Sequence, residues 1–255
     1  MRVIGVVSGK GGVGKTTLVS NLGIALANFG KRVVAVDCNV TTPHLAFNFG
    51  LYYYPLTLNN FLKGEAQFEN IVYSHPSGLE IIPSSLSLDD LIGVDVEKIN
   101  LIFKELASRN YDFVLLDSAP GIGKEAMSVL KNCSEVIFVT IPYMQALADV
   151  LRCLRVTRSL ELKEIGIVLN MVKNSPDELK VRQIEEITGL PVIAKIPFDK
   201  NFQVCSAAGI PLINYKSKSP SSKEIKKLAA SLLGFTYEEK SLWKKVFNLV
   251  RDRLI

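Results

Sequence analysis

Cysteine and histidine are scarce in this chain of 255 residues, which contains four cysteines and two histidines. The cysteines are widely spaced and form no C-x-x-C pair. The sequence therefore gives no support to a zinc site or a disulfide framework, and we expect a reducing cytosol as the surroundings. We interpret the four thiols as small buried hydrophobic groups: Cys38, Cys133, Cys153 and Cys205.

The chain also lacks a long apolar run. No stretch approaches the roughly 18 apolar residues of a membrane-spanning helix, and the apolar run at residues 3–7 is too short for a signal peptide. We expect a cytoplasmic protein that contacts a membrane only peripherally, on its inner face. A strong charge bias is missing too, because the formal net charge is +5 with acids and bases mixed. That balance does not by itself favour nucleic acid as a partner.

Short apolar runs alternate with helical patterns from one end of the chain to the other. The strands that we expect cover residues 3–7, 33–36, 79–83, 113–116, 136–141, 165–170 and 192–196. The helices that we expect cover residues 18–29, 58–63, 86–91, 96–107, 145–159, 179–187 and 219–233. Continuous apolar strands are typical of buried parallel sheets. The pattern predicts an α/β fold, a doubly wound and mostly parallel sheet with helices on both faces.

A glycine-rich segment, Gly9 to Thr16, stands between the first predicted strand and the first predicted helix. It fits the phosphate-loop pattern G-x-x-x-x-G-K-[ST] without a mismatch. Backbone N–H groups and the helix N-terminus would surround phosphate oxygens, Lys15 would reach the β- and γ-phosphates, and the Thr16 hydroxyl would sit on Mg²⁺. The phosphate-binding residues that we predict are Gly11, Gly12, Val13, Gly14, Lys15, Thr16 and Thr17.

Two predicted strands end in an aspartate. Asp37 follows the strand at 33–36, and Asp117 follows the strand at 113–116. Ligands of parallel sheets bind beyond the carboxyl ends of the strands, so both residues should lie near the phosphate loop. Four apolar residues followed by Asp117 is the Walker B pattern. We therefore expect this carboxylate in the second shell of the Mg²⁺ ion beside Thr16.

The string KGGVGKTT at residues 10–17 resembles the deviant phosphate loop of the MinD/ParA ATPases, a SIMIBI-type branch of the P-loop NTPases. The resemblance extends over nearly the whole chain and is strongest to archaeal MinD-like cell-division ATPases. It implies that Lys10 reaches across an ATP-bound homodimer into the partner's nucleotide. Lys10 would then stabilise charge in trans, as an arginine finger does.

The resemblance places the first switch at residues 37–45, with one departure. Sequences of the MinD type usually read D-x-D, whereas this chain carries Asn39 at the second acidic position. An amide can orient water but cannot readily accept a proton. We expect catalysis by Lys10, Lys15, Asp37 and Asn39 to be slow, with Asp37 covering part of the role. A competing hypothesis is that Asn39 positions water as the glutamine of small GTPases does.

The remaining nucleotide contacts also come from the resemblance. Asp117 to Gly121 matches the second switch, where the Gly121 N–H would meet the γ-phosphate. Asn170 matches the residue that hydrogen-bonds adenine. The turn at Pro197, Phe198 and Asp199 matches the turn whose backbone lies beside the base. The chain lacks the N-K-x-D pattern of GTPases after residue 170, so we expect ATP or ADP with Mg²⁺.

Residues 239–255 lie beyond the predicted ATPase domain, residues 1–238. Placed at 100° per residue, the segment from Ser241 forms an amphipathic helix with clustered basic residues, which is typical of an interfacial membrane helix. It resembles the membrane-targeting tail of MinD. A helix that docks on its own core or on a protein partner is the alternative. The residues that we expect at an anionic membrane are Leu242, Trp243, Val246, Phe247, Leu249 and Val250, with Lys244, Lys245 and Arg251.

Three functions are consistent with the resemblance. We favour a MinD-like ATPase, an ATP-dependent dimerisation and membrane-association switch for spatial positioning, with an unidentified regulatory protein as a further partner. A ParA-type partition ATPase that binds DNA non-specifically is the alternative, although it leaves the tail unexplained. An iron–sulfur carrier of the Mrp type needs paired cysteines at a dimer interface, which this sequence lacks.

Overall fold

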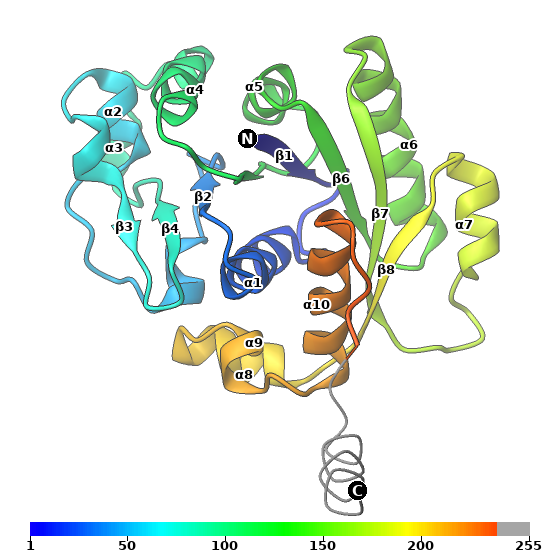
Figure 1. The fold of residues 1–255 in the computed structure, drawn as a ribbon. Helices are drawn as coiled ribbons and strands as arrows, with labels where there is room; N and C mark the ends of the chain where they lie inside the picture. The colour runs from blue at the N-terminus through cyan, green and yellow to red at the C-terminus, as the bar shows by residue number, and fades with distance from the viewer. Residues whose placement is uncertain (239–255) are drawn as a thin grey trace, which may run out of the picture.

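The computed structural model describes residues 1–238, and one eight-stranded sheet forms its centre (Figure 1). The strands are β1 (Arg2–Val7), β2 (Val33–Asp37), β3 (Tyr73–Ser74), β4 (Leu79–Ile82), β5 (Phe113–Asp117), β6 (Glu135–Thr140), β7 (Lys163–Val172) and β8 (Val192–Pro197). Their order across the sheet is β3-β4-β2-β5-β1-β6-β7-β8. The β3–β4 pair is antiparallel, and all other neighbours are parallel.

Helices cover both faces of this sheet. The α-helices are α1 (Lys15–Asn28), α2 (Leu58–Lys63), α3 (Leu88–Leu91), α4 (Asn100–Ala107), α5 (Lys124–Asn132), α6 (Met144–Ser159), α7 (Val181–Thr188), α8 (Asn201–Ala208), α9 (Leu212–Tyr215) and α10 (Pro220–Leu232). Three short 3₁₀ turns among residues 1–238 are η1 (Ala46–Phe49), η2 (Phe68–Ile71) and η3 (Val96–Ile99).

The two faces of the sheet support two separate cores. Helices α1, α9 and α10 pack on one face, and α2, α4, α5, α6 and α7 pack on the other (Figure 1). Neighbouring residues of β2 alternate between these cores, because successive side chains of a strand point to opposite faces. Val34 and Val36 contribute to the α4 side, and Val33 and Ala35 to the α1 side. Burial on both faces explains why the strands read as continuous apolar runs.

The predicted fold class is confirmed, and each predicted strand corresponds to a strand of the sheet. Six elements were not anticipated: β3, α5, α8, α9 and the 3₁₀ turns η1 and η2. The single helix expected at residues 96–107 is in fact a 3₁₀ turn, η3, followed by α4. Helix α5 was missed because its mixed polar and apolar sequence, KEAMSVLKN, directly follows a glycine-rich turn.

The amphipathic helix predicted from Ser241 onward lies outside the described residues, and so does the proposed boundary after residue 238. Both therefore stay predictions. Within residues 1–238, no helix combines the length and the apolar character needed to cross a membrane.

A substitution at Gly166 in β7 tests how closely this strand packs against the chain that enters β8. The φ of Gly166 is +148°, and a Cβ at this position would lie 2.6 Å from the Pro191 carbonyl oxygen. We expect Gly166→Ala to lower the free energy of unfolding by about 1–3 kcal/mol, since both the backbone and the neighbouring chain would have to shift. Urea denaturation measures this loss.

Gly123→Ala is the matched control, because Gly123 has a negative φ and a Cβ added there would meet no atom within 4 Å. Its unfolding free energy should stay within about 0.5 kcal/mol of the wild type. Equal stability of the two variants would contradict the close approach at Gly166.

Candidate nucleotide-binding site

The phosphate loop lies between the end of β1 and the start of α1, on the carboxyl edge of the sheet. Gly12 and Gly14 adopt left-handed backbone angles, with φ values of 78° and 92°. Glycine adopts this conformation without the steric penalty of a Cβ. Gly14 caps α1, and its carbonyl oxygen accepts the first helical hydrogen bond, from Leu18 N at 2.9 Å. The loop therefore has the backbone conformation that presents N–H groups to an anion.

At two positions of the loop, neighbouring residues leave no room for a side chain larger than that of glycine. A Cβ on Gly9 would lie 2.3 Å from the Cβ of Asp149 in α6, and a Cβ on Gly14 would lie 2.3 Å from Asn170 Nδ2. The loop is thus held between α6 and the end of β7. Asp149 was not among the predicted site residues, because only the folded chain brings α6 to the loop.

Lys15 is buried, with 8% of its surface exposed. Its ammonium donates a 2.8 Å hydrogen bond to Ser8 Oγ, and Ser8 in turn donates to the Lys10 carbonyl at 2.7 Å. Burial lowers the pKa of Lys15, and the nearby carboxylate of Asp117 opposes that shift. A buried ammonium with few counter-charges is suited to bind phosphate, since the ligand would replace the solvation that burial removed.

Asp117 ends β5 directly opposite Asp37 at the end of β2. The Thr16 side chain lies beside the Asp117 carboxylate, and Asp117 Oδ1 is buried without a hydrogen-bond partner. Burial raises the pKa of Asp117 to about 6. An orphaned buried carboxylate oxygen beside a threonine hydroxyl fits the outer coordination of Mg²⁺, whose bound waters would supply the missing donor.

Asp37 has a different environment. Its Oδ1 accepts a hydrogen bond from Asn39 N at 3.1 Å, and its Oδ2 accepts from His44 N at 3.0 Å and Leu45 N at 2.9 Å. Burial, and secondarily the charge of Asp117, raises the pKa of Asp37 well above its usual range. Asp37 therefore holds the loop of residues 37–45 in shape, and its predicted part in catalysis stays a prediction.

The Asn39 side chain is engaged within the same loop. Its amide nitrogen donates to the Thr42 carbonyl at 2.7 Å, and its amide oxygen accepts from the Thr42 hydroxyl at 3.1 Å. The amide would have to leave Thr42 in order to orient a water molecule at the γ-phosphate. Its catalytic role is thus a prediction that needs a rearrangement of the loop.

A link between the two switch segments was missed at the sequence level. The Thr41 backbone N–H donates to Glu125 Oε1 at 3.1 Å, and the Thr41 hydroxyl donates to the same oxygen. Glu125 lies in the first turn of α5, directly after the second switch. The two residues are 84 positions apart, so no local pattern signals their contact. The pair ties the first switch to the helix that follows the second.

The second switch lies directly against the phosphate loop. Gly121 has a φ of 79°, and its N–H donates to the Ser8 carbonyl at 2.8 Å. A Cβ on Gly11 would be within 3.9 Å of Pro120, which marks the same contact. The Gly121 N–H, predicted to meet the γ-phosphate, is thus bonded to the loop instead. To contact a γ-phosphate, the Gly121 N–H would have to leave the Ser8 carbonyl and donate to a phosphate oxygen instead.

Lys10 differs from Lys15 in the same loop. Its side chain is exposed, and its ammonium makes no hydrogen bond or ion pair with residues 1–238. Such a side chain can reach beyond its own subunit. The geometry of the single chain is therefore consistent with action on a partner, which itself stays a prediction.

The residues predicted to hold the base lie at the ends of two adjacent strands. Asn170 in β7 is buried and donates from Nδ2 to the Val13 carbonyl at 2.8 Å. Phe198, which follows β8, is 45% exposed, and its N–H bonds to the Val172 carbonyl at 2.9 Å. Asp199 caps α8 by accepting from Asn201 N at 2.9 Å. The structure thus brings Asn170 to the phosphate loop, and it brings the 197–199 turn beside the end of β7.

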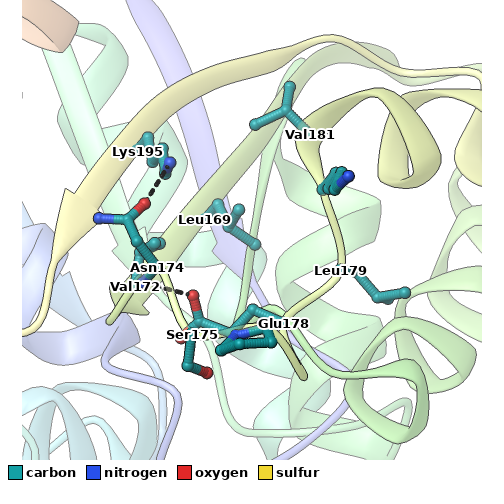
Figure 2. Close-up of a pocket in the computed structure, with 10 residues that line it drawn as sticks. Leu169, Val172, Asn174, Ser175, Glu178, Leu179, Val181 and Lys195 are labelled. Atoms are coloured by element: carbon teal, nitrogen blue, oxygen red, sulfur yellow. Dashed lines mark hydrogen bonds between the residues drawn. The ribbon is translucent and has the colours of Figure 1, made fainter.

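A cavity of about 370 Å³ lies beyond these strand ends, between β7, β8 and the loop that leads to α7 (Figure 2). Three lining residues are linked by hydrogen bonds: Lys195 Nζ donates to Asn174 Oδ1 at 2.7 Å, and the Asn174 N–H donates to Glu178 at 2.8 Å. None of the predicted site residues lines it. The cavity therefore belongs to the 173–180 loop rather than to the phosphate site.

The raised pKa of Asp117 gives a pH prediction for the nucleotide-free protein. The pKa rises from 3.8 to about 6 on folding, so the protonated carboxyl stabilises the folded state below pH 3.8. That stability is lost as the pH rises through about 6. We expect Asp117→Asn, which cannot ionise, to reduce this decline by on the order of 2 kcal/mol. Urea unfolding between these pH values measures it.

Asp177→Asn is the control, because Asp177 is exposed on the loop before α7. It should leave the pH profile unchanged. The same decline in the Asp117→Asn protein as in the wild type would show that this carboxyl does not titrate as its burial demands.

Known proteins that resemble this chain are nucleotide-binding proteins. Residues 4–212 match the model of the CobQ/CobB/MinD/ParA nucleotide binding domain. An uncharacterized ATP-binding protein of Methanocaldococcus jannaschii is 35% identical over 242 residues, which cover 95% of this chain and 91% of the relative. The cell division ATPase MinD of Pyrococcus furiosus superposes with a TM-score of 0.87 at 32% identity, covering 91% of this chain and 98% of that one.

The septum site-determining protein MinD of Pyrococcus horikoshii, solved in complex with Mg-ADP, gives the same TM-score and identity and covers 91% of this chain and 95% of that one. These matches confirm the resemblance predicted from the phosphate loop and the strand ends. The chain belongs to the MinD/ParA family of P-loop ATPases, within the wider CobQ/CobB/MinD/ParA nucleotide-binding family.

Proposed function

We propose that this protein is a MinD-like ATPase, in which ATP drives dimerisation and membrane association for the spatial positioning of a division site or a polar cargo. One observation supports the dimer most directly. Two lysines of one phosphate loop have opposite environments: Lys15 is buried against Ser8, and Lys10 is exposed. Lys15 would hold the nucleotide of its own subunit, and Lys10 the nucleotide of the partner.

The nucleotide in this proposal is ATP with Mg²⁺. The Mg-ADP complex of the Pyrococcus horikoshii relative supports that choice. Thr16 would ligate the metal ion, and Asp117 would hold its water shell through Oδ1. The metal would neutralise charge on the phosphates, and Lys15 would add to that effect. Asn170 Oδ1, opposite the amide nitrogen that bonds Val13, would accept a hydrogen bond from the amino group of adenine.

Hydrolysis would be slow for a structural reason. Asp37 already accepts three backbone hydrogen bonds, and the Asn39 amide is bonded to Thr42. An amide at residue 39 cannot readily accept a proton, and Asp37 would have to give up a backbone hydrogen bond to do so. Once Asn39 leaves Thr42, it would orient water by hydrogen bonding without acting as a base. ATP would consequently persist long enough for a dimer to act as a timed switch.

The γ-phosphate would act on both switch segments. Its oxygen would compete with the Ser8 carbonyl for the Gly121 N–H, which moves the second switch. Glu125 joins the helix after that switch to Thr41 in the first. Movement of one segment would therefore pull on the other, and both would report whether ATP or ADP is bound.

Membrane association in this proposal depends on residues 239–255, with their clustered basic and aromatic residues. Two tails on one dimer would bind with higher avidity than one tail, which couples ATP to localisation. A solved MinC:MinD complex from Aquifex aeolicus supports a regulatory protein as a further partner. The iron–sulfur alternative loses support, because the four cysteines are buried and unpaired.

Lys10→Ala tests the trans role. We expect the wild type to dimerise with ATP and not with ADP, and the variant to stay monomeric and to lose hydrolysis about tenfold or more, since a finger supplied in trans can contribute 10³–10⁵-fold. Light scattering after gel filtration and phosphate release measure both effects. Lys104→Ala, at an exposed position of α4, is the control. A Lys10→Ala protein that dimerises and hydrolyses ATP normally would exclude the trans role.

Asn39→Asp tests the slow timer. A carboxylate at this position can take up a proton, so we expect hydrolysis to accelerate about tenfold or more. Asn39→Ala, which can neither orient water nor accept a proton, should be no faster than the wild type. Phosphate release under saturating ATP distinguishes the three proteins. An unchanged rate in Asn39→Asp would mean that residue 39 takes no part in the chemistry.

A further inference from the structure

Positive charge is concentrated in one part of the described chain. Between residues 195 and 227, seven lysines stand against two acidic residues, an excess of five that equals the formal net charge of the whole protein. The lysines are Lys195, Lys200, Lys216, Lys218, Lys223, Lys226 and Lys227, and the acids are Asp199 and Glu224. The phosphate site uses none of these lysines.

Six of these lysines gather around the first half of α10. Lys195, Lys223 and Lys227 line one cavity of about 430 Å³ between the end of β8 and α10. Lys226 donates to the carbonyl and the hydroxyl of Ser217, so the preceding loop lies against the helix. That loop carries the exposed residues Lys216 and Lys218. We call this set, Lys195, Lys216, Lys218, Lys223, Lys226 and Lys227, the α10 lysine surface.

The folding of α10 does not explain this charge. A helix N-terminus carries partial positive charge, which acidic side chains stabilise and lysines destabilise. The first turn of α10 contains no acidic residue, and Ser219 caps it through the N–H of Ser222. Within this surface Glu224 pairs with Lys227 at 2.7 Å, and the other acid, Asp199, caps α8. The exposed Lys216 and Lys218 on the loop before α10 therefore favour an anionic partner.

The described chain ends beside this surface. After α10, residues 234–238 turn back along the helix (Figure 1), where Gly234 and Tyr237 share a cavity wall with Lys227. Phe235 and Tyr237 also pack on the ring of Phe29, which fixes this return. Segment 239–255 thus continues from a point next to the α10 lysine surface, and it carries further basic residues of its own.

We propose that the α10 lysine surface contacts the anionic lipid headgroups of the same membrane that segment 239–255 enters. This inference rests on the membrane association in the proposed function and adds a second set of contacts to it. Tyr215, which is 47% exposed beside Lys216, would lie at the headgroup level, where aromatic residues are favoured.

The test uses the full chain with ATP and Mg²⁺ and phosphatidylcholine vesicles with or without phosphatidylglycerol. Each lysine near an anionic surface contributes about fivefold to binding. We expect Lys216→Gln combined with Lys218→Gln to weaken co-sedimentation with phosphatidylglycerol vesicles about tenfold or more. ATP hydrolysis without vesicles should stay unchanged, because neither lysine belongs to the nucleotide site.

Lys104→Gln combined with Lys131→Gln is the matched control, since both lysines are exposed on α4 and α5 of the opposite layer. It should bind vesicles as the wild type does. If the wild type binds vesicles and the 216/218 variant binds equally well, this inference is wrong and the proposed membrane switch stands. If the wild type ignores vesicles but binds duplex DNA through Lys216 and Lys218, both the inference and the membrane switch are wrong.

Discussion

The site depends on charges that the parallel sheet forces close together. The ends of β2 and β5 place Asp37 and Asp117 side by side, and the phosphate loop folds the Lys15 ammonium into the same buried region. Burial raises the pKa of both carboxyls and lowers the pKa of the lysine. Each charged form is thus disfavoured until a ligand supplies opposite charge. Phosphate would satisfy the lysine, and Mg²⁺ would satisfy Asp117.

The two buried carboxylates differ in their hydrogen-bond partners. Asp37 is surrounded by backbone N–H groups, so it shapes the first switch even without a ligand. Asp117 keeps one buried oxygen without a partner, and this oxygen is left for the water shell of a metal ion. The Gly121–Ser8 and Thr41–Glu125 contacts then connect both switch segments to this centre. A ligand that binds between Lys15 and Asp117 would therefore act on both switch segments through these contacts.

The sequence predicted the parts of the site that depend on neighbouring residues. The first strand, the glycine loop and the first helix are consecutive in the chain, so the pattern from Gly9 to Thr16 was sufficient to predict the phosphate loop. The position of Asp117 was predicted from the apolar strand that it ends. Contacts between distant segments could not be predicted in this way. Asp149 approaches Gly9 from α6, and Glu125 reaches Thr41 from α5, 84 positions further along the chain. Such pairs follow from tertiary packing, which single-sequence periodicity does not contain.

The buried centre at the ends of β2 and β5 should be a Mg-ATP site. Calorimetric titration of ATP into the full chain, with Mg²⁺ and with a chelator, tests this most directly, and GTP serves as the competing nucleotide. We expect Mg²⁺ to strengthen ATP binding at least tenfold, GTP to bind more weakly, and Lys15→Ala to abolish binding, because the metal ion and Lys15 each supply positive charge to the phosphates. ATP binding that is unaffected by Mg²⁺ or by Lys15→Ala would contradict a Mg-ATP site.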